Sequence, residues 1–154
     1  TGIVALRPDK KAFHHHIGKK IGKKDFDTTF HVADELSDEI LAYCANFKPY
    51  YVIMESPLPT SSMSPALWCL DTLLAKKFGS DLIKTYNPSM LTRIFGKKNH
   101  TKPESIALAN KYKELMEQDG WLFQTRKMVH DEAEAFIYTN WYHLYDPHQK
   151  VRKR

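Results

Sequence analysis

Three acidic residues could form one chemical site because of where they lie in the sequence. Glu55 directly follows the apolar run Tyr50–Met54, and Asp131 and Glu134 lie three residues apart near the start of an expected helix. A buried strand of an open α/β sheet ends where such sheets bind ligands, and residues three apart share one helical face. Two acids on one face repel each other unless a cation lies between them. Three carboxylates would form an all-oxygen site, which prefers Mg²⁺ or Mn²⁺ over zinc or copper.

Such a site predicts a particular reaction, although each acid also has an ordinary explanation. Two ions about 4 Å apart can activate a water and stabilise the leaving oxygen in phosphodiester hydrolysis. However, a strand-end acid can simply face solvent, and acids in a first helical turn interact favourably with the helix dipole. The run His14-His15-His16 does not predict a second metal site. On a strand only His14 and His16 face the same side, and no third ligand is evident.

The basic residues are gathered in blocks along the chain. The 154 residues carry 23 Lys and Arg against 18 Asp and Glu, a net charge of +5. Residues 7–24 hold seven basic residues and one acid, 25–55 hold seven acids and only Lys48, 82–103 hold no acid, and 150–154 hold four basic residues. Separated basic blocks suit a protein that binds a polyanion with part of its surface. A randomly decorated surface is the alternative explanation.

The elements that must position these residues alternate between strands and helices. Thr1–Arg7 and Ala12–Ile17 are expected to form a hairpin around the turn Pro8-Asp9-Lys10. The hydropathy pattern then predicts helices over 34–47, 64–78, 101–120 and from about Asp131, with strands over 50–54 and 82–86. Thr101 and Glu104 have the spacing of a capping box. This order predicts an α/β sandwich with a mixed sheet, antiparallel at the hairpin and parallel afterwards.

The composition excludes several classes of protein. Apolar residues make up 42% and charged residues 27%, which is incompatible with wholesale disorder. No apolar run approaches the ~20 residues of a membrane-spanning helix, and the first residues lack the layout of a signal peptide. Cys44 and Cys69 show no CxxC pairing, so a disulfide framework or zinc ribbon is not expected. We therefore expect one globular domain over 1–154, located in the cytoplasm and without a membrane partner.

The order of these segments resembles the RuvC-type Holliday junction resolvases of the RNase H-like superfamily, specifically a phage-borne member, over nearly the whole chain. TGIVAL at 1–6 looks like the family's second strand, and YYVIMESP at 50–57 looks like the strand that ends in its catalytic glutamate. Ile94-Phe95-Gly96 and Lys102 are in register with the family's hydrophobic pair, glycine and lysine. HDEAEAFIY at 130–138 is similar to its final D-x-x-D helix, with Asp131 and Glu134 at the acidic positions.

The resemblance implies a fold, an activity and a set of site residues. The fold would be an RNase H-like mixed sheet flanked by helices, and the activity a metal-dependent cleavage of four-way DNA junctions by a homodimer. The helices over 34–47 and 64–78 are the candidates for the dimer surface. The implied catalytic residues are Glu55, Asp131, Glu134 and Lys102; the three acids would hold two Mg²⁺ or Mn²⁺ ions, and the DNA contacts would come from Lys19, Lys20, Arg93, Lys97, Lys98 and Lys102.

One catalytic residue of the family is missing from the 154 residues. The family's first aspartate ends a first strand, shortly before the segment that resembles Thr1–Leu6. That strand is central in the RNase H-like sheet, and its loss would expose neighbouring strand edges, so we expect the chain to be part of a longer polypeptide. Asp9 lies in the expected turn and cannot readily replace this aspartate. A non-catalytic nucleic-acid-binding module and a transposase or integrase core remain alternatives.

Overall fold

The computed structural model describes the chain except for residues 19–25, 48–51, 56–63, 88 and 146–154. It also leaves out a few side chains inside helices and strands, among them that of Glu55. The protein is mixed α/β, as predicted, and it divides into two compact units. Unit 1 comprises Thr1–Ile17 and His100–Arg154, and unit 2 comprises Gly18–Asn99.

The sheet of unit 1 begins with the predicted hairpin. Strands β1 (Gly2–Leu6) and β2 (Lys11–His16) are antiparallel, with Val4 opposite His14. The tight turn between them places Lys10 at a φ of 59°. A two-residue strand that the sequence analysis did not predict, β5 (Leu122–Phe123), pairs parallel with β2, so the strand order is β1-β2-β5. Among the described strands, β1 is therefore an edge of this sheet.

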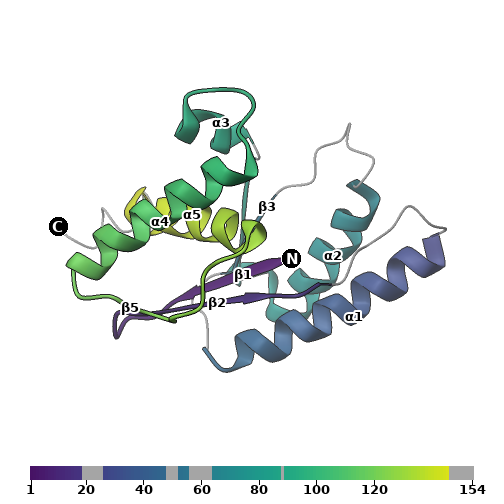
Figure 1. Ribbon diagram of the computed structural model, residues 1–154. Coiled ribbons are helices and arrows are strands. Elements are labelled where there is room, and N and C mark those ends of the chain that lie inside the picture. The colour runs from purple at the N-terminus through teal and green to yellow at the C-terminus, as the bar shows by residue number, and fades with distance from the viewer. Residues whose placement is uncertain (19–25, 48–51, 56–63, 88, 146–154) are drawn as a thin grey trace. The chain divides into compact units, whose positions relative to one another are not determined.

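Two helices pack beside each other in unit 1, and α5 also packs on the hairpin (Figure 1). Helix α4 spans Lys102–Gln118 and has the predicted capping box. The Thr101 hydroxyl accepts a hydrogen bond from the Glu104 N–H, and the Glu104 carboxylate accepts one from the Thr101 N–H. Helix α5 spans His130–Tyr145, within one residue of its expected start. The start of α4 is thus fixed by a local sequence signal.

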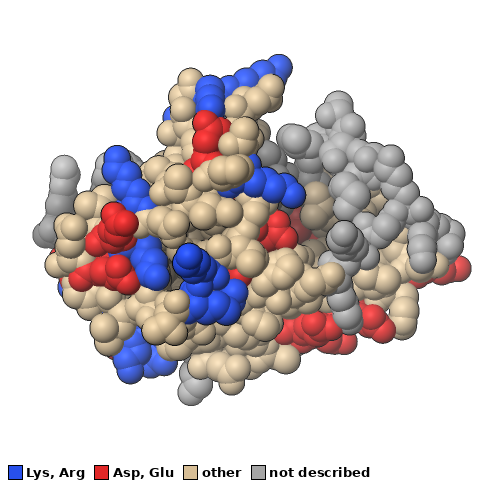
Figure 2. Space-filling view, in the orientation of Figure 1, with Lys and Arg blue, Asp and Glu red and all other residues tan. Residues whose placement is uncertain are grey.

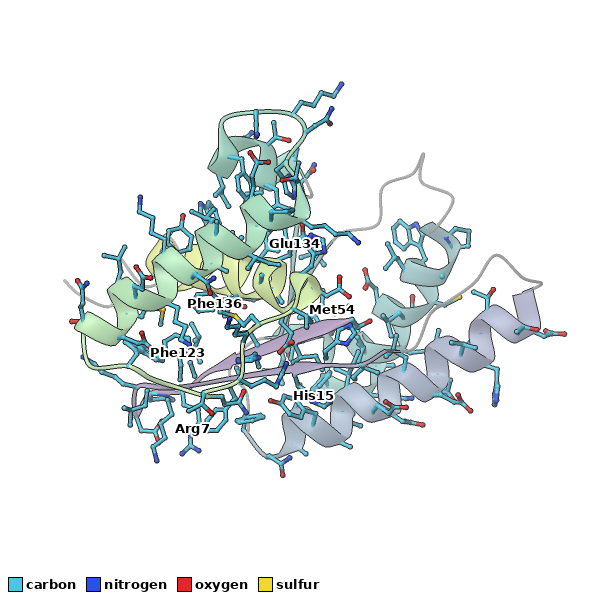
Figure 3. The ribbon with its side chains drawn as sticks, in the orientation of Figure 1. Arg7, His15, Met54, Phe123, Glu134 and Phe136 are labelled. Atoms are coloured by element: carbon cyan, nitrogen blue, oxygen red, sulfur yellow. The ribbon has the colours of Figure 1, made fainter. Side chains whose placement is uncertain are left out.

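The core of unit 1 lies beneath α5. Phe136 is fully buried there and meets Phe123 edge to face, with ring centroids 5.5 Å apart (Figure 3). Strand β1 passes very close to the first turn of α5. A Cβ atom at Gly2 would lie 2.2 Å from the backbone carbonyl of Asp131, so only glycine fits at this position. The backbone of β1 is thereby brought directly against the helix that carries the paired acids.

Unit 2 is built from a helix pair and two strands. Its elements are α1 (Phe26–Ala45), β3 (Val52–Glu55), α2 (Ser64–Phe78), the short 3-10 turn η1 (Ser80–Leu82), β4 (Ile83–Tyr86) and α3 (Ser89–Phe95). Strands β3 and β4 are parallel, as predicted. Helices α1 and α2 pack together, and Leu36, Ile40, Leu70 and Leu74 are buried. Lys77 of α2 donates hydrogen bonds to Asp34 and Asp38 of α1, both at 2.8 Å.

Besides strand β5, three features of the fold differ from the prediction. Helix α1 begins at Phe26 instead of Asp34, because Thr29 and Ala33 extend its buried face although neither is strongly apolar. Helix α3 was not predicted; it follows Asn87, whose side chain accepts a hydrogen bond from the Ser89 N–H. The described strands form two sheets, not one. None of the described helices is both long and apolar enough to cross a membrane.

Candidate active site at the start of helix α5

Asp131 is held at the surface by groups from two segments of unit 1. Its Oδ2 lies 3.2 Å from Nε2 of His16 on β2. Nδ1 of His130 is 3.5 Å from the other carboxylate oxygen. Partial burial works to raise the pKa of Asp131, and the interactions with His16 and His130 work to lower it. Asp131 is thus paired with two histidines at the start of α5.

Glu134 lies on the same helix and contacts the segment that carries Lys102. Its Oε1 is 3.0 Å from Nε2 of His100 and accepts a hydrogen bond of 3.3 Å from the Ser105 hydroxyl. Nε2 of His130 lies at 3.0 Å from the same oxygen. Lys102, the first residue of α4, is exposed and lies between these two contacts in the sequence. The structure thus brings the start of α4 close to Glu134, which is labelled in Figure 3.

Glu132, between the two predicted acids, points into the protein and is fully buried. It forms two hydrogen bonds with Arg126, at 2.9 Å from Nη1 and 2.6 Å from Nη2, and accepts one from the Val129 N–H at 3.2 Å. The buried His14 donates a further hydrogen bond from Nδ1. Burial alone would raise the pKa of this carboxyl, but these interactions, led by those with Arg126, lower it from 4.5 to about 2.

The sequence analysis missed Glu132 and its partners as residues of this region. One signal was available, because Glu132 precedes Phe136 by four residues and so shares the apolar face of α5. His14 and His16 do face the same way, as the strand pattern predicts. They contact two different acids of α5, and therefore do not share one ligand. His100 and His130 carried no pattern that would have singled them out.

Glu55 occupies the position predicted for its backbone. It is the last residue of β3, opposite Tyr86 of the parallel strand β4. Its side chain lies outside the described part of the structure, and it belongs to unit 2, whereas Asp131 and Glu134 belong to unit 1. The convergence of the three acids therefore stays a prediction. Asp9 lies in the hairpin turn and pairs with Arg7 at 2.9 Å, as expected for an acid outside the site.

The predicted DNA-binding residues occupy several segments. Arg93 on α3 and Lys97 and Lys98 after it are exposed in unit 2, and Lys102 is exposed in unit 1. Lys19 and Lys20 lie outside the described residues. Figure 2 shows basic side chains interspersed with acids on the visible face, and a run of acids along α1. This pattern matches the acidic stretch seen in the sequence between two basic blocks.

The metal site and the family assignment have no independent support. Among the described side chains, which exclude Glu55, no group of three or more His, Cys, Asp or Glu residues is arranged to hold a metal ion. Asp131 and Glu134 offer the carboxylate oxygens that Mg²⁺ and Mn²⁺ prefer, but two protein ligands need further partners to complete a site. Neither a protein-family model nor a curated protein sequence matches the chain.

Proposed function

We propose that this chain is the core of a metal-dependent endonuclease that nicks four-way DNA junctions. The observation that supports the proposal most is that Glu134 contacts His100 and Ser105, which lie on either side of Lys102 in the sequence. Asp131 and Glu134 on α5 and the start of α4, which carries Lys102, thus belong to one region of unit 1. Asp131, Glu134 and Glu55 would bind Mg²⁺ or Mn²⁺, which would activate a water for attack on the phosphodiester. Lys102 would offset the charge that develops on the phosphate.

The RNase H-like fold is part of this proposal and would require one further strand. Among the described strands, β1 is an edge of its sheet, and β3 and β4 form a separate sheet. In the fold that the resemblance implies, a strand N-terminal to β1 is central and carries the first catalytic aspartate. We propose that such a strand pairs with β1 and completes the site. Since an open strand edge is a site for adding another strand, recovery of the upstream sequence tests this directly.

The decisive experiment uses the protein with its native upstream sequence, a labelled four-way junction and Mg²⁺. Glu55→Gln keeps the size of the side chain and removes its charge, so we expect cleavage to be lost while junction binding remains. Lys102→Ala should slow cleavage with only a partial loss of binding. Asp119→Asn is the matched control, because Asp119 is an exposed acid whose side chain pairs with Lys10.

The outcomes separate the proposal from its alternatives. Cleavage by Glu55→Gln at the native rate would rule out the proposed chemistry. Junction binding by the unmodified protein without any Mg²⁺- or Mn²⁺-dependent cleavage would instead support a non-catalytic binding module. Joining of a cut DNA end to a second duplex would support a transposase or integrase core. A variant that neither binds nor folds would show that Glu55 is structural.

A homodimer is the expected assembly, since two subunits can place symmetric nicks on a near-symmetric junction. The proposed dimer surface is the α1–α2 pair of unit 2, where Phe30 and Trp68 are exposed. Trp68 exposes 56% of its surface, which is unusual for so large an apolar residue. We expect Trp68→Glu to shift the protein from dimer to monomer in analytical ultracentrifugation. An unchanged sedimentation coefficient would place the interface elsewhere.

A further inference from the structure

The first turn of α5 contains a buried charge that the proposed chemistry does not use. Glu132 is fully buried, whereas its neighbours Asp131 and Glu134 reach the surface region described above. Its carboxylate receives hydrogen bonds from two segments: from Arg126 and Val129 in the loop before α5, and from His14 on β2. Arg126 also donates to the backbone carbonyl of His14 at 3.3 Å. The strand, the loop and the helix are therefore joined at one carboxylate.

Stability alone does not explain why a charge is placed here. A buried ion pair loses so much hydration that well-packed apolar residues of similar size are often at least as stabilising. What the ion pair adds is a fixed geometry. Arg126 binds both oxygens of Glu132 through two nitrogens, in the paired arrangement that restricts distance and orientation together. An apolar contact at this position would supply no directional bond and so would add nothing to the restraint that packing already places on the helix.

The rotation of α5 decides where the two surface acids point. Successive residues of an α-helix are about 100° apart around the axis, so Asp131 and Glu134 lie about 60° from each other. Glu132 lies about 100° from Asp131 and about 160° from Glu134, and hence on another side of the helix. Strand β2 fixes two of these positions at once, because His14 contacts Glu132 and His16 contacts Asp131.

We propose that Glu132, Arg126 and His14 form a positioning unit that sets the rotation of α5 and thereby holds Asp131 and Glu134 in the geometry needed to bind a divalent cation. The cation-binding part of this inference rests on the proposed function. The positioning part rests on the contacts of unit 1 alone. Glu132 and Arg126 are thus positioning residues that act through Asp131 and Glu134, and neither touches the substrate.

The test compares variants in the full chain with its native upstream sequence. Glu132→Gln removes the charge, and Arg126→Lys keeps the charge but loses the paired geometry. Two properties are measured: the affinity for Mn²⁺ alone by electron paramagnetic resonance, and the through-space NMR contacts between the His16 ring and Asp131. We expect Glu132→Gln to weaken Mn²⁺ binding about tenfold or more, as is typical when a group that orients a ligand is removed, and to weaken the NMR contacts. Arg126→Lys should give a smaller change in the same direction.

Lys77→Ala provides the matched control, because it removes a salt-bridge network in unit 2. It should lower the melting temperature without changing Mn²⁺ affinity or the His16 contacts. If Glu132→Gln does not fold, the half-exposed Arg126 still allows the test through Arg126→Lys. Native Mn²⁺ affinity together with unchanged NMR contacts in a folded variant would overturn the inference. If the unmodified protein does not bind Mn²⁺, the proposed metal site fails, and the NMR contacts alone decide whether Glu132 positions Asp131.

Discussion

Replacing Arg126 by alanine should destabilise unit 1 in a way that depends strongly on pH. In the folded protein the pKa of Glu132 is lowered from 4.5 to about 2, and Arg126 is the strongest cause of that lowering. A shift of this size corresponds to about 3 kcal/mol of stability, at about 1.4 kcal/mol for each pKa unit. Without Arg126 the buried carboxylate loses its main partner, and breaking such a pair typically costs ~3 kcal/mol or more. We therefore expect Arg126→Ala to lower the free energy of unfolding by about 3 kcal/mol at pH 7.

The sign of the pH dependence follows from the lowered pKa. The stabilisation by Glu132 is complete well above pH 4.5 and is lost as the pH falls towards 2, because in that range the unfolded state takes up a proton while the carboxylate of the folded state stays ionised. Urea unfolding followed by circular dichroism should therefore show a large difference between the native protein and Arg126→Ala at pH 7, and roughly half of it or less at pH 3. Lys127→Ala, at the exposed neighbouring position, is the control. An equal difference at pH 7 and pH 3 would refute the assignment of this energy to the Glu132 carboxylate.

Three other predictions concern packing, thiol chemistry and binding. Gly2→Ala would place a Cβ atom 2.2 Å from the Asp131 backbone and should lower the melting temperature markedly, whereas Gly18→Ala, with no atom within 4 Å, should not. Burial raises the pKa of the Cys44 thiol to about 11, so its alkylation by iodoacetamide at pH 8 should be slow and should accelerate towards pH 11; rapid reaction at pH 8 would contradict this. Junction affinity should fall steeply with salt, by ~0.9 in the log–log slope for each phosphate contact on duplex DNA. A flat salt response in a filter-binding titration would argue against a polyanionic partner.

Local signals in the sequence were sufficient to predict most elements. The hairpin, the capping box at Thr101 and the helix ending before Gly79 are encoded by residues within a few positions of one another, and all three were confirmed. The predicted start of α1 was wrong because Thr29, which lies before it, is buried although its side chain is polar. Strand β5 has two residues, and its pairing with β2 depends on the tertiary structure. A pattern of that length carries no signal of its own.

The site was predictable only in part, for a related reason. The prediction that Asp131 and Glu134 lie on one helix was correct, and their spacing relates them because residues three apart share a helical face. The contacts made by His16, His100 and Arg126 join segments distant in the sequence, and no local spacing encodes them. The burial of Glu132 is the clearest case. Three acids in one turn look equivalent in the sequence, and the tertiary structure makes one of them internal.

The division of the chain into units has a consequence for the order of folding during synthesis. Unit 1 is assembled from Thr1–Ile17 and His100–Arg154, which lie on either side of unit 2. The hairpin is made early, but Ala12, His14 and Ile17 are buried only in the finished unit, which includes α5. Closing a loop as long as Gly18–Asn99 costs on the order of 4 kcal/mol in chain entropy when that segment is unfolded. Early folding of unit 2 on the ribosome would shorten this loop. Because α5 is synthesised last, the nascent hairpin stays exposed to chaperones and proteases until then.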